Sequence, residues 1–364
     1  MARELVIDMT PTCVNKTAIY HIAIDTYEAL SDYKLHPQFC GVDRPIPTDE
    51  ADRKSIAEDF LSRVSTWAAG TAHDDELMLA EVESKSRPPQ IFFDPIYTLC
   101  HELREGDVVF VLDLSTLTNP SWHPPAVALC YERAFRKLLG SRARIVSISH
   151  HCTTILRANF SIPSSEITTV PLYLRKLPTT ASRQTRWELK QQKFFLFVGS
   201  MESRKNLVGL IRAFALSGLS DRGWKLALAG GKGRGWEEID RAAREIDGVE
   251  LLGYVSDEEL AWLYGNAAAF TYPSYLEGFG LPLLEAMAYG LPCLASITGA
   301  SQEVCGDLGV LVDPYHMGSV VDALMRFADP LHSGDKALTE RLKARAADFT
   351  FDRYLATLRE ALPY

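Results

Sequence analysis

The second half of the chain alternates short apolar segments with amphipathic segments in a regular order. The apolar segments at 194–200 and 224–231 contain glycine at their ends, and the segment between them at 206–218 has the spacing of a helix. Apolar strands separated by helices of ten or more residues predict a parallel, doubly wound sheet. Ligands of such sheets bind beyond the carboxyl ends of the strands, so we expect the functional residues there.

The first half of the chain shows the same alternation less regularly. Its strand candidates are the apolar runs ELVIDM, QFCGV, QIFFD, DVVFVLD, ARIVSIS and ITTV, and its expected helices lie near 16–30, 51–69 and 124–139. A chain of 364 residues is long for one hydrophobic core. We therefore predict an α/β protein with two doubly wound, Rossmann-like domains at 1–175 and 193–349, joined by a polar linker at 176–192.

Composition excludes several classes of function. A net charge of −9 argues against general nucleic-acid binding, because no domain-wide basic surface is expected to neutralise phosphates. Seven scattered cysteines without a C-x-x-C pair indicate a reducing compartment, so we expect a cytoplasmic protein. The amino terminus resembles a first strand rather than a signal peptide, and no apolar run approaches a membrane span. No metal site is expected, since the one dense acidic cluster, at 73–76, falls in a polar loop.

The stretch YLEGFGLPLLEAMAYGLP at 275–292 joins a predicted strand end to a predicted helix start. The apolar run at 267–274 precedes it and is expected to be a buried strand. Pro282 suits the first turn of a helix over about 281–289. The free N–H groups and dipole of that helix start favour a phosphate.

Two carboxylates flank this turn. Gly278 and Gly280 allow the backbone to turn tightly and to approach a ligand closely. Glu277 lies before the turn and Glu285 lies in the early part of the helix. Carboxylates accept hydrogen bonds from vicinal hydroxyls, so this layout suits a nucleotide sugar, which has a sugar on each side of its diphosphate.

Residues 275–292 resemble the E-x7-E signature of retaining glycosyltransferases of family GT4, and residues 190–330 resemble the nucleotide-binding half of that family. The resemblance implies the GT-B architecture, in which two doubly wound domains face a central cleft. It implies that a C-terminal helix, here within 350–364, crosses back to the first domain, which binds the acceptor. It also implies independence of metal ions. No cofactor is expected, and the nucleotide diphosphate sugar is the donor substrate.

The resemblance assigns donor contacts residue by residue. Glu277 is expected to be catalytic and to hold the sugar with Gly278, Phe279, Gly280 and Leu281. The other donor-binding residues are expected to be Arg204 and Lys205 for the diphosphate, the backbone at Tyr254 and Val255 for the base, and Glu285 for the ribose. Ser200 occupies a position where many members carry an arginine.

Three further segments near the donor half have simpler explanations. The glycine-rich loop at 230–235 either approaches the ligand or merely connects two elements. Ser256 with Glu259 forms a predicted capping box at a helix start. Ser301, in a segment at 298–304 that resembles another turn of the family near the donor, is either a ligand contact or a helix cap.

In the first half, Asp113 and His150 are the catalytic candidates because each follows a predicted strand. Asp113 either acts in the site or caps the next turn, and Leu112 stands where many GT4 members have a histidine. His150 has a side chain suited to proton transfer near neutral pH, although paired histidines at a helix start are more often structural. Asn15 and Lys16 either approach the ligand or only begin a helix.

Basic residues gather in one part of this acidic chain. They are Arg133, Arg136, Lys137, Arg142 and Arg144. Such a cluster suits peripheral contact with an anionic inner membrane face, where a polyprenol-linked acceptor would be found, but a solvated basic face explains it as well.

These features predict a retaining, metal-independent glycosyltransferase that moves a hexose from a nucleotide diphosphate sugar to a hydroxyl of a glycan or lipid-linked glycan. Mannose from GDP-mannose is the preferred donor. The alternatives are a sugar-nucleotide epimerase on the same scaffold and a catalytically silent nucleotide-sugar-binding protein. The silent alternative is motivated by Leu112 and Ser200.

Overall fold

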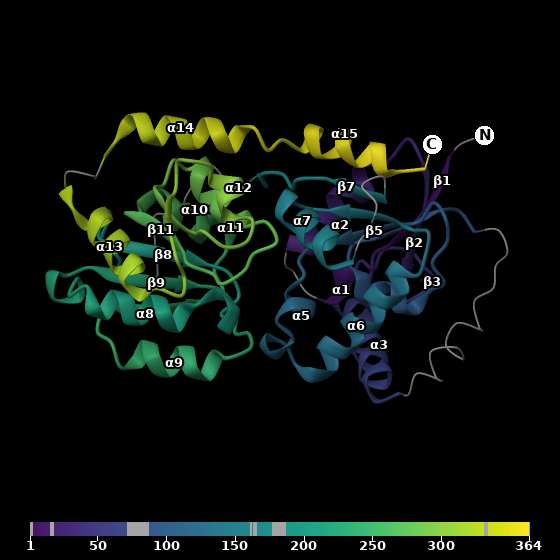
Figure 1. Ribbon diagram of the computed structural model, residues 1–364, viewed down its shortest axis with the longest axis horizontal. Helices are drawn as coiled ribbons and strands as arrows, with labels where there is room; N and C mark the ends of the chain where they lie inside the picture. The colour runs from purple at the N-terminus through teal and green to yellow at the C-terminus, as the bar shows by residue number, and fades with distance from the viewer. Residues whose placement is uncertain are drawn as a thin grey trace. The chain divides into compact units, whose positions relative to one another are not determined.

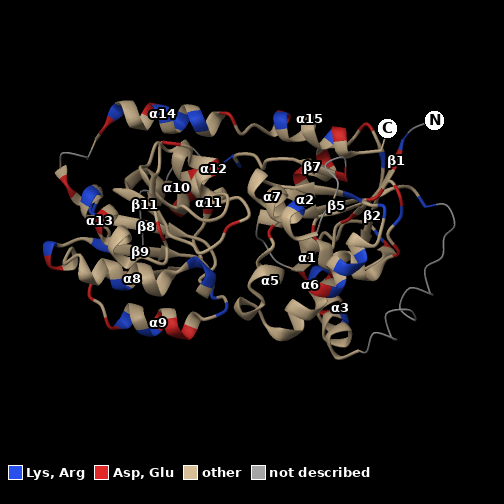
Figure 2. Cartoon of the chain, in the orientation of Figure 1, with Lys and Arg blue, Asp and Glu red and all other residues tan. Residues whose placement is uncertain are grey.

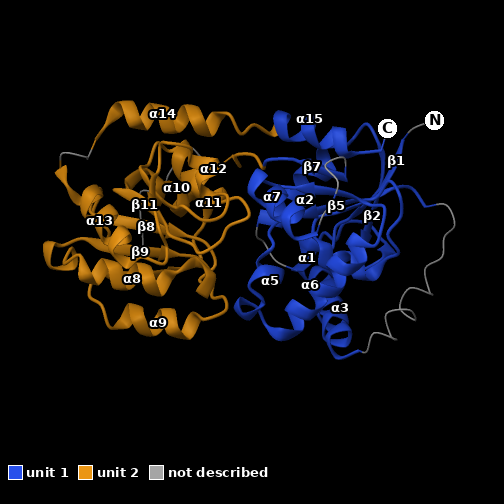
Figure 3. Ribbon diagram, in the orientation of Figure 1, with its two compact units in different colours: residues 1–171, 352–364 blue, residues 172–351 orange. Residues whose placement is uncertain are grey.

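The computed structural model describes residues 3–14, 18–70, 87–160, 162, 166–176, 187–330 and 334–363. The chain divides into two compact units, which are coloured separately in Figure 3: unit 1 comprises residues 1–171 and 352–364, and unit 2 comprises residues 172–351. The division falls a few residues before the expected domain boundary at 175. The acidic cluster at 73–76 lies outside the described residues. So do residues 177–186, which make up most of the predicted linker.

Unit 1 is built on a seven-stranded sheet in the order β3-β2-β1-β4-β5-β6-β7. Its strands are β1 (Glu4–Asp8), β2 (Lys34–Phe39), β3 (Val42–Asp43), β4 (Gln90–Phe92), β5 (Val108–Val111), β6 (Arg144–Ser147) and β7 (Ile167–Thr169). Every neighbouring pair is parallel except β2 and β3, which form a hairpin. The strands β4 and β5 are buried along their whole length, as expected of a parallel sheet covered on both faces.

The helices of unit 1 cover the two faces of this sheet (Figure 1). They are α1 (Pro11–Val14), α2 (Ala18–Ala29), α3 (Glu50–Ala69), α5 (Ser115–Thr118), α6 (Pro125–Leu139), α7 (His150–Phe160) and α15 (Phe351–Ala361), with the 3-10 helices η1 (Pro95–Cys100) and η2 (Pro120–Trp122). The hydroxyl oxygens of Thr26 on α2 and Tyr354 on α15 are 2.6 Å apart, and Arg359 pairs with Asp32 at 2.7 Å. These contacts fix the C-terminal helix to unit 1.

Unit 2 is built on a six-stranded, wholly parallel sheet in the order β10-β9-β8-β11-β12-β13. Its strands are β8 (Phe194–Val198), β9 (Lys225–Ala229), β10 (Val249–Gly253), β11 (Ala269–Tyr272), β12 (Cys293–Ser296) and β13 (Val310–Val312). The reversal of strand order between β8 and β11 creates a topological switch point. Open α/β sheets bind their ligands at the carboxyl ends of the strands at such a point.

The helices of unit 2 lie on both faces of its sheet, with α8 and α9 on one side and α10, α11 and α12 on the other (Figure 1). They are α8 (Leu207–Leu216), α9 (Trp236–Arg244), α10 (Asp257–Asn266), α11 (Leu281–Ala288), α12 (Ser301–Cys305), α13 (Met317–Ala328) and α14 (Lys336–Ala347), with the 3-10 helices η4 (Ser203–Lys205) and η5 (Ser220–Arg222). The aromatic side chains of β8 fill the core, where Phe195 stacks on Trp224 at 5.0 Å between ring centroids.

The predicted α/β class with parallel sheets is confirmed. The expected strand at 267–274 is β11, and the expected helix at 281–289 is α11. Charged residues lie mainly on helices and loops (Figure 2). In α9 the acids stand in the first turn and the bases in the last turn, an order that complements the helix dipole.

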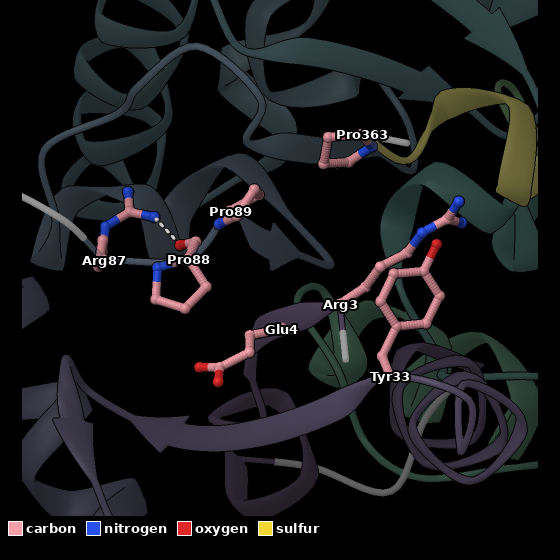
Figure 4. Close-up of a pocket in the computed structure, with 7 residues that line it drawn as sticks. All are labelled: Arg3, Glu4, Tyr33, Arg87, Pro88, Pro89 and Pro363. Carbon is pink, nitrogen blue, oxygen red and sulfur yellow. Dashed lines mark hydrogen bonds between the residues drawn. The ribbon is translucent and has the colours of Figure 1, made fainter. Parts of the chain in front are cut away.

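A shallow cavity of about 350 Å³ opens beside the first residue of β1 in unit 1 (Figure 4). Its lining comprises Arg3, Glu4, Tyr33, Arg87, Pro88, Pro89 and Pro363. This cavity lies at the amino-terminal end of the strands. Ligands of doubly wound sheets bind at the opposite end, so we place the candidate site elsewhere.

Candidate functional site

The turn between β11 and α11 carries the two predicted glutamates. Glu277 and Glu285 are only 5% and 6% exposed, respectively. Gly280, at the N-cap of α11, has a φ of +108°, which a side chain would strain, and Pro282 lies in the first turn. The sequence therefore folds locally into a tight turn that feeds an uncapped helix start, as the motif predicts.

Two cations bind the carboxylate of Glu277. Lys205 Nζ donates to Oε1 at 2.6 Å, and Arg204 Nη1 donates to Oε2 at 3.2 Å. Burial raises the pKa of Glu277, but Lys205 and Arg204 outweigh burial and bring this pKa to about 2. Glu277 is therefore a buried carboxylate anion at neutral pH. Lys205 also donates to the hydroxyl of Tyr272, a partner that the sequence analysis did not identify.

The turn after β8 positions these cations. Arg204 Nε donates to Glu202 at 3.0 Å, and the hydroxyl of Ser200 donates to the other oxygen of Glu202 at 2.6 Å. Ser200, which occupies the position of an arginine in many GT4 members, thus helps to orient the glutamate that holds Arg204. Asn206 closes the turn in the left-handed conformation, with a φ of +56°, and its amide donates to the carbonyl of Pro273 at 3.2 Å.

The glycine-rich loop at 230–235 packs against this turn. A Cβ atom on Gly230 would lie 1.9 Å from the carbonyl oxygen of Gly199, and Gly230 has a φ of +146°. The backbones of Met201 and Lys232 form a β-bridge, and Ser203 N donates to the carbonyl of Arg234 at 2.9 Å. The loop therefore supports the turn that carries Lys205, and its glycines permit close approach of two backbones.

The segment after β12 packs against the backbone of Glu277. Ala300 N donates to the carbonyl of Glu277 at 3.0 Å, and a Cβ atom on Gly299 would lie 2.7 Å from Glu277 N. The suggested capping role of Ser301 is wrong, because Ser301 is the first residue of α12 and makes no capping hydrogen bond; Ala300 occupies the cap position. The side-chain oxygen of Ser301 is buried and has no hydrogen-bond partner within the described part of the chain.

Glu285 has partners from two other segments. Arg175 Nε donates to Oε1 at 3.2 Å, and the hydroxyl of Tyr264 on α10 donates to Oε2 at 3.0 Å. Burial raises the pKa of Glu285, and Arg175 and Tyr264 oppose that rise. Arg175 was not predicted as a site residue. The available signal in the sequence was a cation at the predicted linker boundary.

The remaining donor candidates lie at the same sheet edge. Tyr254 and Val255 follow β10; Tyr254 is 76% exposed, and Val255 is partly exposed. Phe279 is buried and lies edge-on to Phe349 at 5.7 Å, and Gly278 is buried too, whereas Leu281 is partly exposed. Ser256 and Glu259 form the predicted capping box. That the other residues of this paragraph contact a donor stays a prediction.

In unit 1, Asp113 makes the hydrogen bonds expected of a residue that caps the next turn. Its Oδ1 accepts from Ser115 N at 2.9 Å and from Ser115 Oγ at 2.7 Å, and Ser115 Oγ lies 2.9 Å from His123 Nε2. His150 is the exposed first residue of α7. Asn15 and Lys16 lie outside the described residues. These contacts account structurally for Asp113 and leave catalytic roles for Asp113 and His150 as predictions.

Two buried aspartates of unit 1 were not predicted. Asp8 ends β1 and Asp94 follows β4, so both lie at the carboxyl edge of the sheet. Burial raises the pKa of each to about 7, although hydrogen bonds from Thr10 to Asp8 and from Ile96 N to Asp94 oppose the rise. The apolar runs around these residues gave no signal that distinguishes a buried acid from a solvated one.

The basic residues on and after α6 mostly bind backbone carbonyls. Arg133 donates to Trp67 and Gly70 at the end of α3, and Lys137 donates to Thr98 and His101 near η1. Arg144 donates to Ala361 and Leu362 at the end of α15. Cations at helix C-termini stabilise the fold. These contacts favour a structural role over a membrane-binding one for these three residues.

The described residues contain neither a helix that could cross a membrane nor a cluster of three or more His, Cys, Asp or Glu side chains arranged to hold a metal ion. None of the seven cysteines, all of which are among the described residues, forms a disulfide.

Comparison with known proteins places this geometry in context. The family described as glycosyl transferases group 1 matches residues 180–345. The O-antigen chain mannosyltransferase B of Escherichia coli is 32% identical over 275 residues, which cover 72% of this chain and 71% of that protein. The serotype-specific mannosyltransferase WbdA of Escherichia coli is 30% identical over 163 residues, which cover 42% of this chain and 19% of that protein.

Solved structures of low sequence identity share the fold. The sucrose-phosphate synthase of Thermosynechococcus elongatus has a TM-score of 0.69 at 17% identity, and 98% of each chain is covered. WaaG, described as a glycosyltransferase involved in lipopolysaccharide biosynthesis, has a TM-score of 0.64 at 15% identity with the same coverage. These likenesses confirm the predicted GT-B architecture.

Proposed function

Because the chain belongs to the glycosyl transferases group 1 family, as its GT4 resemblance predicted, and is therefore a transferase, we propose that it moves a hexose from a nucleotide diphosphate sugar to a hydroxyl of a glycan or lipid-linked glycan. We propose GDP-mannose as the donor, transfer with retention, and no requirement for a metal ion. Two relatives whose names describe mannosyltransferases support mannose as the sugar. Retention and metal independence rest on the resemblance to GT4, and GDP is proposed only because mannose is the proposed sugar.

The buried contact of Lys205 and Arg204 with Glu277 is the observation that carries this proposal. Burying ion pairs costs desolvation free energy, so such a cluster beside an uncapped helix start favours a functional role over a purely stabilising one. Lys205, Arg204 and the backbone N–H groups of the turn that leads into α11 suit a diphosphate. Glu277 would then hold the hexose and Glu285 the ribose.

The proposed chemistry follows from charge. When the bond between the sugar and the diphosphate breaks, negative charge develops on the leaving oxygen and positive charge develops on the sugar ring. Lys205, Arg204 and the backbone N–H groups of the turn before α11 would stabilise the negative charge on the leaving oxygen. The Glu277 carboxylate would stabilise the positive charge on the sugar ring. Transfer with retention then has the acceptor attack from the face that the diphosphate leaves, and the departing phosphate takes the acceptor's proton.

Membership of a transferase family argues against the epimerase alternative. The silent-binding alternative is weakened by Ser200, whose contact with Glu202 supports Arg204 rather than leaving the cation site incomplete. An acceptor linked to a polyprenol remains part of the proposal, but the contacts of Arg133, Lys137 and Arg144 do not support membrane binding through these residues.

A panel of GDP-, UDP-, ADP- and TDP-sugars tests the proposal in buffer with EDTA. The melting temperature is measured with each donor, and the products are identified for any donor that stabilises the protein. We expect stabilisation by GDP-mannose and slow release of mannose when no acceptor is present. Stabilisation without turnover would support silent binding, a changed nucleotide sugar would support an epimerase, and no stabilisation by any donor would contradict the proposal.

A further inference from the structure

Arg175 connects Glu285 to a second acid on another helix. Its Nε donates to Glu285 Oε1 at 3.2 Å, while its Nη1 donates to both carboxylate oxygens of Asp257, at 3.0 and 3.1 Å. The Arg175 side chain is 21% exposed and that of Asp257 is 50% exposed, whereas that of Glu285 is 8% exposed. The guanidinium therefore spans from a solvated anchor to a buried carboxylate.

The contacts of Glu285 leave it able to accept further hydrogen bonds. A carboxylate has about four lone-pair sites. Arg175 occupies a site on Oε1 and the hydroxyl of Tyr264 occupies a site on Oε2, so each oxygen retains capacity for another donor. By this count, binding of two vicinal hydroxyls does not require displacement of either protein partner.

Within the described part of the chain, Arg175 is the cation that acts on Glu285. The titratable groups that act on it are Arg175 from the segment after β7, Tyr264 and Asp257 from α10, and Tyr289 after α11. Among these groups only Arg175 is a cation. The planar guanidinium fixes the direction of its hydrogen bonds and also supplies a charge, whereas an ammonium group supplies a charge without a fixed direction.

We propose that Arg175 is a positioning residue that keeps Glu285 ionised and oriented so that Glu285 binds the two ribose hydroxyls of the donor nucleotide. This inference rests on the proposed function, because it assumes that Glu285 binds the ribose. Asp257 anchors the guanidinium, and Tyr264 fixes the opposite oxygen of Glu285. Arg175 thus acts through Glu285 and makes no contact with the donor itself.

The test compares nucleotides that differ only in the groups that Glu285 would bind. Calorimetric titrations with GDP and with 2′,3′-dideoxy-GDP are made at pH 6, 7 and 8 on the wild type, Arg175→Ala, Arg175→Lys and Asp257→Asn. Arg341→Ala is the control, because Arg341 forms an exposed ion pair with Asp307 at 3.3 Å in the same unit. Melting temperatures of all variants are measured in parallel.

We expect the wild type and Arg341→Ala to prefer GDP over its dideoxy analogue. Arg175→Ala should bind GDP about tenfold more weakly and lose most of that preference, with the loss greatest at pH 6, because burial without Arg175 favours protonated Glu285. Affinity for 2′,3′-dideoxy-GDP should change little. Arg175→Lys should recover part of the affinity, and Asp257→Asn should show a smaller loss in the same direction.

Other outcomes separate the inference from the proposed function. If the wild type does not prefer GDP over the dideoxy analogue, the ribose role of Glu285 is wrong and the inference falls with it. If the wild type shows the preference and Arg175→Ala keeps it at every pH, the inference is wrong while the proposed function stands. An equal loss for both nucleotides would also overturn the inference. Should Arg175→Ala not fold, Arg175→Lys and Asp257→Asn decide by the same criteria.

Discussion

Lys205 Nζ lies 2.6 Å from Oε1 of Glu277, and both side chains are buried in a contact that joins the turn after β8 to the turn after β11. The two strands are neighbours in the sheet, so their carboxyl ends bring together residues that are distant in sequence. A donor diphosphate that binds Lys205 must share this cation with Glu277. Under the proposed function, one cation therefore contacts both the diphosphate and the carboxylate that would hold the sugar.

Replacing Lys205 with alanine should lower kcat/KM for the donor. The loss should correspond to about 2 to 5 kcal/mol of transition-state stabilisation, because a desolvated charge facing the diphosphate is lost. The matched control is Lys225→Ala. Lys225 pairs with Glu250 at the same distance of 2.6 Å, but that pair is partly exposed on β9 and β10. Steady-state kinetics with GDP-mannose should show the loss only for Lys205→Ala, and an unchanged kcat/KM would remove Lys205 from the site.

The two glutamates should differ in their kinetic effects. Glu285→Gln should weaken GDP binding about tenfold, because a neutral amide is a poorer acceptor for the ribose hydroxyls. Glu277→Gln should leave GDP binding largely intact and lower turnover, because its proposed partner is the sugar. Calorimetry with GDP and rate measurements with GDP-mannose distinguish the two effects, and identical losses in both assays would contradict the assignment.

Replacing each of two adjacent glycines in the loop after β9 with alanine should change the stability of the protein by very different amounts. Gly230→Ala should destabilise the protein by about 1 to 3 kcal/mol, because the new Cβ would collide with the carbonyl of Gly199 and the backbone φ is unfavourable for alanine. A Cβ on the exposed Gly231 would meet no atom within 4 Å, so Gly231→Ala should change stability by less than about 0.5 kcal/mol. Equal urea midpoints for the two variants would show that the loop does not pack on the turn.

Asp94 should make stability depend on pH. Its pKa is raised from 3.8 to about 7 in the folded protein, mainly by burial. A raised folded pKa means that the contribution of Asp94 to stability is fully present at acid pH and is lost as pH rises from about 4 to 7. Asp94→Asn cannot ionise and can still cap η1 through its side-chain oxygen.

The melting temperature of Asp94→Asn relative to the wild type should therefore be higher at pH 8 than at pH 5. The pKa difference corresponds to at most about 4 kcal/mol between the two protonation states. A relative melting temperature that is the same at both pH values would show that Asp94 is not a buried acid of this kind.

The strand and helix pattern was predictable because it depends on local periodicity. The apolar run before Glu277 became β11, and Pro282 marked the start of α11, since such signals lie within a few residues of the element that they specify. The turn that carries Lys205 was identified for the same reason, because it directly follows an apolar strand.

Contacts between distant segments were not predictable. Arg175 and Glu285 are separated by 110 positions, and no local pattern in the sequence pairs them. Asp94 is buried and forms hydrogen bonds with Ile96 N of η1 and with Tyr131, contacts that an apolar run cannot reveal. Ser301 failed as a cap because Ala300 already occupies the cap position of α12. Each case depends on which segments the sheet brings together.

A single-turnover assay of GDP-mannose in buffer with EDTA tests the central claim most directly. Release of GDP and mannose is followed for the wild type and for Glu277→Gln, with GDP affinity measured on the same samples. We predict that the wild type cleaves GDP-mannose without metal and that Glu277→Gln binds GDP but cleaves the donor at least about tenfold more slowly. Equal cleavage rates in both proteins, or no GDP binding by the wild type, would contradict the account.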